Sequence, residues 1–156
     1  MDLFDDWYRA EHPRLLASMV LLCGRVDEAR EATDEAFARA YERWTRVALM
    51  ASPGGWTYRV AVNVLRRRGR RHALELRLLR RTPPMPDLPA PAGEAWVLVA
   101  DLPVRQRTAV VLRYVADLPE ADIAQIMGIR RGTVAALLTQ ARQRLGVALT
   151  TEVTDG

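Results

Sequence analysis

The sequence predicts an all-α fold, made of two small helical domains joined by a proline-rich linker. Ala, Leu, Arg and Glu supply nearly half of the 156 residues, and isoleucine occurs only three times. The abundant residues are strong helix formers, so helices are favoured along most of the chain. Residues 82–92 then hold five prolines, a density that neither a helix nor a central strand tolerates. This linker separates residues 1–81 from residues 93–156, where we expect a four-helix domain with a helix-turn-helix.

Three helices are expected in the N-terminal part. The first runs from about Asp2 to Leu22, where apolar side chains recur at roughly 3.6 spacing, and Gly24 is its expected stop. The second runs from about Asp27 to Thr45 and repeats small and aromatic residues at intervals of three and four. A loop through Ser52–Gly55 follows. The third helix begins near Gly55 and continues to about Leu79, with an apolar first half and an arginine-rich second half.

Four shorter helices are expected in the C-terminal part. Their approximate bounds are Glu94–Ala100, Val104–Tyr114, Pro119–Met127 and Arg130–Leu149. Pro103 and Pro119 fall in or beside the first turn of a helix, where a proline is tolerated because no intrahelical acceptor is needed there.

The segment Glu120–Val134 has the spacing of a helix-turn-helix. Ala124 supplies the small residue that two closely crossing helices need, and Gly128 supplies a turn residue that tolerates positive φ. A set of apolar side chains would fill the wedge between the helices: Ile123, Met127, Ile129, Val134 and Leu138. The second helix would be the one offered to the major groove of DNA. Three residues at its N-terminal end can hold phosphate, and they are Arg130, Arg131 and Thr133. The alternative is a plain helical hairpin whose glycine is only a cap.

Positive charge is concentrated in one segment. The net charge is +4 and all 23 basic residues are arginine. Residues 59–81 hold nine of these arginines against one acid, Glu75, whereas the remaining 14 arginines face 18 acids. A mildly acidic protein with one basic stripe indicates a polyanionic partner, with nucleic acid first. A solvated basic helix and a membrane-surface helix are the alternatives.

Several functional classes are disfavoured by what the sequence lacks. The longest uncharged runs fall short of the ~18 residues needed to span a membrane, and acids precede the first arginine, unlike a signal peptide. A single cysteine, Cys23, indicates a reducing cytoplasm, and we expect its side chain to be buried. The chain has two histidines and no Gly-rich phosphate loop. We therefore expect no enzyme activity, no cofactor, no metal and no small-molecule substrate.

Motifs in both parts fit one protein family. In the C-terminal part they are Leu102-Pro103, Arg105–Arg107, Val110–Tyr114, Ile123-Ala124, Gly128, Gly132–Val134, Ala141-Arg142 and Leu145. This pattern resembles the promoter-reading domain of extracytoplasmic-function (ECF) sigma factors, a subfamily of bacterial RNA polymerase sigma factors. Ala29–Trp44 resembles the helix with which such factors grip core RNA polymerase. Trp56–Arg71 resembles the helix that melts and reads the minus-ten promoter element.

The resemblance implies a set of roles for individual residues. The residues implied to contact polymerase are Glu31, Asp34, Glu35, Tyr41 and Trp44. The residues implied to contact the single-stranded minus-ten element are Trp56, Arg59, Asn63, Arg66, Arg67, Arg70 and Arg71. The residues implied to contact the duplex minus-thirty-five element are Arg130, Arg131, Thr133, Thr139 and Gln140. Core RNA polymerase and promoter DNA are the implied partners, and the family adds an anti-sigma protein as a candidate. Asn63 can both donate to and accept from a base, or cap a neighbouring turn; Trp56 can stack on a base or belong to the core.

Two departures from the family pattern carry consequences. Where the polymerase-gripping motif usually has Asp-x-x-Gln, this chain has Glu31 and Asp34, which replaces an amide donor by an anion. The recognition helix carries Ala135 and Leu137 where basic residues are usual, so direct base readout is reduced and DNA shape gains weight.

Two other functions remain open at this stage. An autonomous helix-turn-helix regulator would bind duplex DNA without polymerase. An adaptor would keep only protein contacts, through Leu137 as a partner-facing apolar residue and through the acidic second helix. The sigma factor is favoured because two matching domains occur in the right order.

Overall fold

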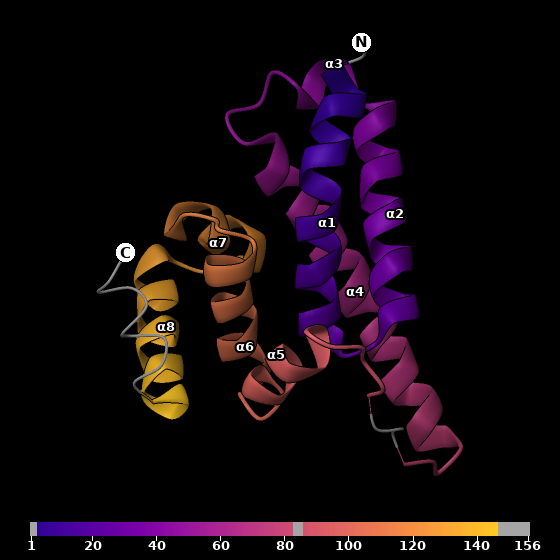
Figure 1. Cartoon of the computed structure of the whole chain (residues 1–156), viewed down its shortest axis with the longest axis vertical. Helices are drawn as coiled ribbons and strands as arrows, with labels where there is room; N and C mark the ends of the chain where they lie inside the picture. Colours follow the sequence, from indigo (N-terminus) through magenta and orange to yellow (C-terminus); the bar gives the residue numbers. More distant parts are fainter. Residues whose placement is uncertain (1–2, 83–85, 147–156) are drawn as a thin grey trace.

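The computed structural model describes residues 3–82 and 86–146, and every regular element in these ranges is a helix. The all-α prediction is therefore confirmed. Figure 1 shows two groups of helices side by side, one from the first half of the chain and one from the second. None of the described helices combines the length and the apolar character needed to cross a membrane.

The first group holds α1 (Leu3–Cys23), α2 (Val26–Glu42), the short α3 (Trp44–Val47) and α4 (Pro53–Leu78). α2 packs against both α1 and α4 (Figure 1). Four alanines on its inner face are fully buried, namely Ala29, Ala32, Ala36 and Ala40. Their small side chains allow the neighbouring helices to approach closely.

Two predicted helix boundaries in this group are wrong. α4 begins at Pro53 rather than near Gly55, because Pro53 needs no acceptor in the first turn and Ser52 caps the helix. The Ser52 hydroxyl accepts a hydrogen bond from the Gly55 amide at 3.0 Å. α2 ends at Glu42, and the residues predicted to continue it form the separate α3.

The second group holds α5 (Ala92–Val99), α6 (Val104–Val110), α7 (Glu120–Met127) and α8 (Arg131–Leu145). α6 continues directly into a π-helical turn, η1 (Val111–Val115), where a regular α-helix to Tyr114 was expected. α8 ends at Leu145 and is capped by Gly146, which has φ +78°; residues 147–149, also predicted to be helical, lie outside the described residues.

The helix-turn-helix prediction is confirmed in its geometry. Gly128 is left-handed with φ +66°, which any residue with a Cβ adopts at a cost. After it, the Ile129 amide donates to the Ala124 carbonyl at 3.0 Å and closes the C-terminus of α7. Ile123, Val134 and Leu138 are fully buried between the helices.

One apolar expectation for this domain is wrong. Leu137 is only 8% exposed and belongs to the buried core. It occurs one position before the fully buried Leu138, so both side chains pack inward from α8 and Leu137 cannot serve as a partner-facing residue.

The two groups of helices share one buried core. Buried residues of α1, α2 and α4 join those of α6, η1, α7 and α8 in a single cluster. α7 packs against α4, and α1 packs against α5, α6 and η1. Contacts between the halves are therefore part of this fold.

Candidate nucleic-acid and polymerase interface

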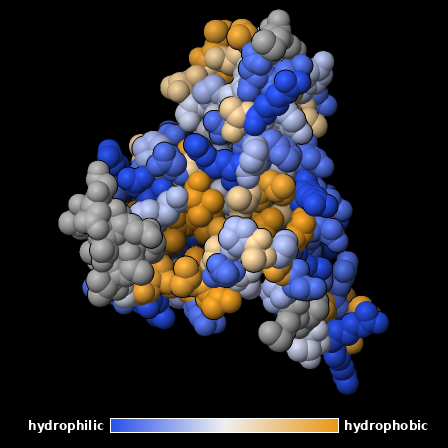
Figure 2. Space-filling view, viewed as in Figure 1, coloured by the Kyte–Doolittle hydropathy of each residue, from blue (hydrophilic) through white to orange (hydrophobic). Residues whose placement is uncertain are grey.

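α4 presents a polar stripe on one face and the protein core on the other. The exposed side chains follow helical spacing and comprise Arg59, Asn63, Arg66, Arg67, Arg70 and Arg71. Between them lie buried residues, including Tyr58, Ala61 and Leu65, which anchor the helix. Figure 2 shows hydrophilic side chains gathered where α4 projects from the body. The structure thus brings six of the seven predicted minus-ten residues onto one accessible face.

Trp56 is the seventh, and it is only half-buried. It lies one turn before the exposed stripe, between the buried Gly55 and Thr57. Its indole is partly covered by the core and partly accessible at the start of α4, so neither alternative, core residue or base-stacking ring, describes it alone.

Arg68 differs from the other arginines of α4 because it has a partner on α2. Its guanidinium donates to the carboxylate of Glu31, and the side chains are 39% and 55% exposed. An exposed ion pair of this kind contributes little stability. Within residues 3–82 and 86–146, no carboxylate pairs with Arg66 or Arg70, which leaves both free for phosphate.

The predicted polymerase-binding carboxylates of α2 differ in whether they already have a partner within the protein. Glu31 is held by Arg68, and Glu35 accepts a hydrogen bond from Arg39 at 2.5 Å one turn later. Asp34 is exposed and makes no ion pair with the described residues. Of the three carboxylates, Asp34 is the one fully available to a partner.

Tyr41 and Trp44 belong to an aromatic cluster between α1, α2 and α3. The Phe4 ring lies 5.1 Å from that of Tyr41 and 5.3 Å from that of Trp44, in edge-on arrangements. Trp7 stacks at a tilt on Trp44, with 5.0 Å between the ring centroids. Such pairs hold the helix ends together. Tyr41 is still 62% exposed, so it can contact a partner, whereas Trp44 is half-buried.

The predicted residues of α8 also divide into two kinds. Arg130 and Arg131 are exposed at the start of the helix, and Arg131 lies 3.9 Å from a Glu120 oxygen. Thr133 is half-buried in the first turn. Thr139 and Gln140 are exposed but already bonded within the protein. The Thr139 hydroxyl donates to the Ala135 carbonyl at 3.0 Å, and the Gln140 amide oxygen accepts from Gln106 at 3.4 Å. Arg130 and Arg131 are therefore the strongest candidates for DNA contact.

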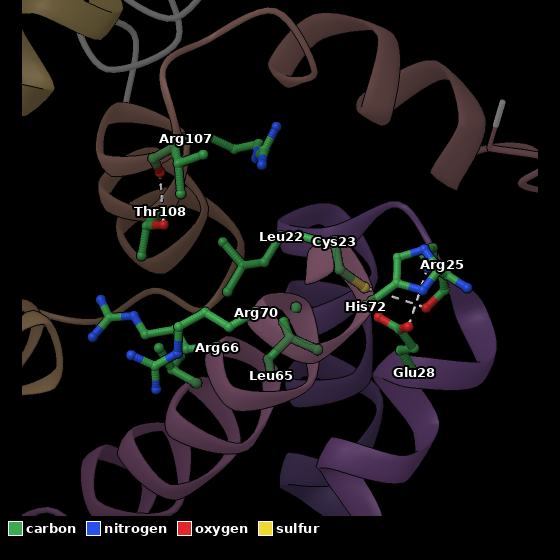
Figure 3. A pocket seen from close by; sticks show the side chains of 14 residues that line it. Leu22, Cys23, Arg25, Glu28, Leu65, Arg66, Arg70, His72, Arg107 and Thr108 are labelled. Carbon is green, nitrogen blue, oxygen red and sulfur yellow. Dashed lines mark hydrogen bonds and ion pairs between the residues drawn. The ribbon is translucent and has the colours of Figure 1, made fainter. Parts of the chain in front are cut away.

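Sequence reasoning missed the junction between the two halves. A cavity of about 560 Å³ opens there between α1, α2, α4 and α6. Figure 3 shows Leu22 and Leu65 facing Thr108 of α6 across it, and Arg66 and Arg70 also line it. The lining side chains come from segments far apart in the sequence, so no local pattern signals this cavity.

Two side chains at the junction have shifted pKa values. Burial raises the pKa of the Cys23 thiol to about 11, although the thiol donates a hydrogen bond to the Arg25 carbonyl at 3.3 Å. The Arg107 guanidinium has its pKa lowered by burial; it donates to the Ala100 carbonyl at 3.2 Å and lies over the Trp96 ring. Cys23 is half-buried rather than fully buried, and its thiol stays protonated near neutral pH.

Among residues 3–82 and 86–146, no three His, Cys, Asp or Glu side chains are grouped so that they could hold a metal ion.

Comparison with known proteins gives one consistent result. Residues 93–145 match the family model "Sigma-70, region 4". The chain is 30% identical over 146 residues to the ECF RNA polymerase sigma factor SigM of Mycobacterium tuberculosis, covering 91% of this chain and 74% of that protein. It is 28% identical to the RNA polymerase sigma-E factor of Streptomyces coelicolor, covering 91% and 83%. These two alignments include the N-terminal half.

A solved structure has a similar fold. The sigma factor RpoE of Bartonella quintana, crystallised with the anti-sigma factor NepR, matches with a TM-score of 0.76. The match covers 91% of this chain and 93% of that one, at 19% sequence identity.

Proposed function

Because the chain belongs to the ECF family of RNA polymerase sigma factors, we propose that its two halves divide the recognition of a promoter between them. As a sigma factor it directs core RNA polymerase to specific promoters for transcription initiation, and it is not itself an enzyme. The helix α4 would hold the minus-ten element as a single strand, and α8 would contact the minus-thirty-five element as duplex. The observation that carries this division is the exposed, unpaired arginine face of α4.

The minus-ten assignment rests on charge and accessibility. Arg66 and Arg70 are exposed one turn apart without a carboxylate partner among the described residues, so they can neutralise neighbouring phosphates. Asn63 lies one turn earlier on the same face, where its amide can pair with an unstacked base. Trp56, half-exposed at the start of the helix, offers a ring for base stacking.

The minus-thirty-five assignment rests on the geometry of the helix-turn-helix. Gly128 sets the turn, and Arg130 and Arg131 stand exposed at the N-terminus of the recognition helix. A helix N-terminus with two arginines favours phosphate. Since Thr139 and Gln140 already bond within the protein, sequence readout depends more on DNA shape than on base-edge hydrogen bonds.

Polymerase binding is assigned to the outer face of α2. Asp34 and Tyr41 are its most exposed candidates, and Glu31 becomes available when its ion pair with Arg68 opens. The functional units would be residues 1–81, the linker 82–92 and residues 93–156, acting in the cytoplasm. An anti-sigma protein is a further partner, on the analogy of the RpoE–NepR complex.

The test combines binding and transcription. The purified chain is mixed with core RNA polymerase, passed over a gel-filtration column, and the co-eluting complex is used for run-off transcription on a pool of genomic promoters. New, specific start sites in the co-eluting fraction support the proposal. Absence of co-elution would count against the proposal and would make Glu31 and Asp34 the first residues to test as a lost polymerase contact. DNA binding by the chain alone, with no effect of polymerase, would favour an autonomous regulator.

A further inference from the structure

The cavity at the junction has the size and the lining of a small-molecule site. Its volume of about 560 Å³ lies within the range of about 300–1,000 Å³ in which proteins hold small organic ligands. Apolar side chains from α1, α4 and α6 form much of its wall, and they are Leu22, Val62, Leu65, Ala73 and Val104. Figure 3 shows Leu22 and Leu65 turned toward this space. Such a wall favours a ligand with an apolar body, because removal of apolar surface from water drives binding.

Positive charge surrounds the same space. Four arginines line the cavity together with one carboxylate, and these residues are Arg25, Arg66, Arg70, Arg107 and Glu28. The Glu28 carboxylate lies 3.2 Å from the Arg25 guanidinium and is neutralised by it. Within residues 3–82 and 86–146, no carboxylate forms an ion pair with Arg66, Arg70 or Arg107. The lining therefore attracts an anion.

Arg107 is only partly satisfied by the protein. One terminal nitrogen donates to the Ala100 carbonyl at 3.2 Å, and the guanidinium lies over the Trp96 ring, 5.2 Å from its centroid. The Nε of Arg107 is buried and has no hydrogen-bond partner among the described residues. Burial also lowers the pKa of this guanidinium, because removal from water disfavours its charged form. An anion in the adjoining cavity would offset that cost through charge-assisted hydrogen bonds.

Gly69 keeps the α4 side of the cavity clear. It lies in the middle of the α4 residues that line the cavity, which recur at helical spacing from Val62 to Ala73. Glycine is the least favourable helix residue after proline, and Gly69 is not among the glycines with positive φ. Apart from its own stretch of helix, a Cβ at this position would meet no atom within 4 Å. Neither the backbone nor the packing requires glycine here, whereas a larger side chain would enter the cavity.

From these observations we propose that the cavity binds an amphipathic carboxylate, with its alkyl chain against the apolar wall and its carboxylate among Arg66, Arg70 and Arg107. The charge of the lining selects an anion over a cationic amphiphile of the same length. The apolar wall selects an alkyl chain over a small hydrophilic anion. Binding at this site is reversible and involves no covalent step.

An occupied cavity would weaken the hold on DNA, and this consequence rests on the proposed function. Arg66 and Arg70 line the cavity, and they are also the arginines assigned to minus-ten phosphates. A carboxylate beside these guanidinium groups takes up their donors and repels phosphate. The ligand is therefore expected to inhibit binding of the minus-ten strand.

Isothermal titration calorimetry of the full chain with dodecanoate tests the site without polymerase or DNA. We expect saturable binding with a Kd of about 10–100 µM, because a single acyl chain by itself gives an association constant of roughly 10⁴ M⁻¹ for an apolar environment. Dodecyltrimethylammonium, with the same chain and a cationic head, should bind at least about tenfold more weakly. Acetate, which has the carboxylate without the chain, should show no binding. Equal affinity for the two long-chain probes, or no saturable binding of dodecanoate, would overturn the proposal.

Filling the cavity provides a specific test. Gly69→Leu should abolish saturable binding of dodecanoate. Gly132→Leu makes the same change in α8, at a glycine that does not line the cavity and whose Cβ would also meet nothing within 4 Å, so the Kd should stay unchanged. Neither variant should unfold at a lower urea concentration than the parent chain, because leucine is the better helix former. Full binding by a folded Gly69→Leu chain would show that dodecanoate binds elsewhere and would refute the site.

Charge variants test the place of the carboxylate. Arg70→Gln removes one of the unpaired arginines of the lining, and we expect dodecanoate to bind about tenfold more weakly. Arg71→Gln is the control, since Arg71 is the next exposed residue of α4 and does not line the cavity. Equal effects of the two substitutions would mean a general attraction to the basic helix and would contradict the proposed position of the carboxylate.

Fluorescence anisotropy with a labelled single-stranded minus-ten oligonucleotide measures the effect on DNA. With dodecanoate at about five times its Kd, full competition should raise the apparent Kd of the parent holoenzyme for the oligonucleotide about sixfold. Holoenzyme that contains Gly69→Leu should show no change on addition of dodecanoate. An unchanged affinity of the parent holoenzyme, despite calorimetric binding to the free chain, would refute the competition. A holoenzyme that does not bind the oligonucleotide at all would instead count against the proposed function, and calorimetry would still decide the ligand site.

Discussion

The double substitution Arg66→Ala, Arg70→Ala tests whether the polar face of α4 holds single-stranded DNA. Both guanidinium groups are exposed and neither pairs with a carboxylate of the described residues, so each can contribute a full phosphate contact. On single strands a contact contributes about 0.7 to the slope of log K against log salt, so the slope should fall by roughly 1.4. Between 50 and 200 mM salt, that difference corresponds to about a sevenfold change in relative affinity.

The assay is fluorescence anisotropy of holoenzyme with a labelled single-stranded minus-ten oligonucleotide over that salt range. Arg9→Ala is the matched control, since Arg9 is an exposed arginine on α1 to which no DNA contact is assigned. Its slope should change by less than half as much. An unchanged slope in the double variant would mean that Arg66 and Arg70 face solvent or polymerase, and the minus-ten assignment to this face would be refuted.

Four further outcomes follow from the structure. Gly128→Ala places a Cβ at φ +66° with nothing within 4 Å, so strain alone should lower the free energy of unfolding by about 1 kcal/mol, measured by urea denaturation. Asp34→Gln supplies the amide that the family motif usually has, and this substitution should strengthen the binding of core polymerase about three- to tenfold. Glu42→Gln, at the far end of α2, is the control and should leave the affinity for core polymerase unchanged. The folded Cys23 thiol should react with a disulfide reagent at pH 8 about a hundredfold more slowly than in the unfolded chain, because a pKa near 11 instead of 9.0 reduces the thiolate fraction by that factor. Since burial raises the pKa values of both Cys23 and Tyr58, their contribution to stability is present below pH 9 and should be lost as pH rises toward 12, which pH-dependent denaturation would detect.

Local patterns were sufficient for the long helices and for the helix-turn-helix, but not for the separate α3 or for η1. Periodicity placed the end of α1 and the start of α8 to within one residue, whereas α8 was expected to reach Leu149 and ends at Leu145. Gly128 was identified because a tight turn demands positive φ. The boundary of α4 was missed because Ser-Pro-Gly-Gly reads equally as a loop and as a capped first turn. Only the Ser52 cap, seen in three dimensions, decides between them.

Side-chain availability was less predictable than side-chain type. The sequence indicates which residues of α2 and α8 carry charge or amides. It does not indicate that Glu31 forms an ion pair with Arg68 or that Gln140 accepts a hydrogen bond from Gln106. Those partners lie 37 and 34 residues away along the chain. Leu137 was misplaced for a related reason. Its burial depends on which neighbouring helix α8 packs against, and the periodicity of α8 alone does not determine that.

The partnered residues also suggest why a single chain can carry both recognition surfaces without premature engagement. Glu31 is bonded to Arg68 of α4, so under the proposed function polymerase at α2 and a DNA strand at α4 would each take one member of this ion pair. If polymerase takes Glu31, Arg68 is released toward the DNA strand. This release adds positive charge to the DNA-facing side of α4, so polymerase binding should strengthen the hold on the minus-ten strand.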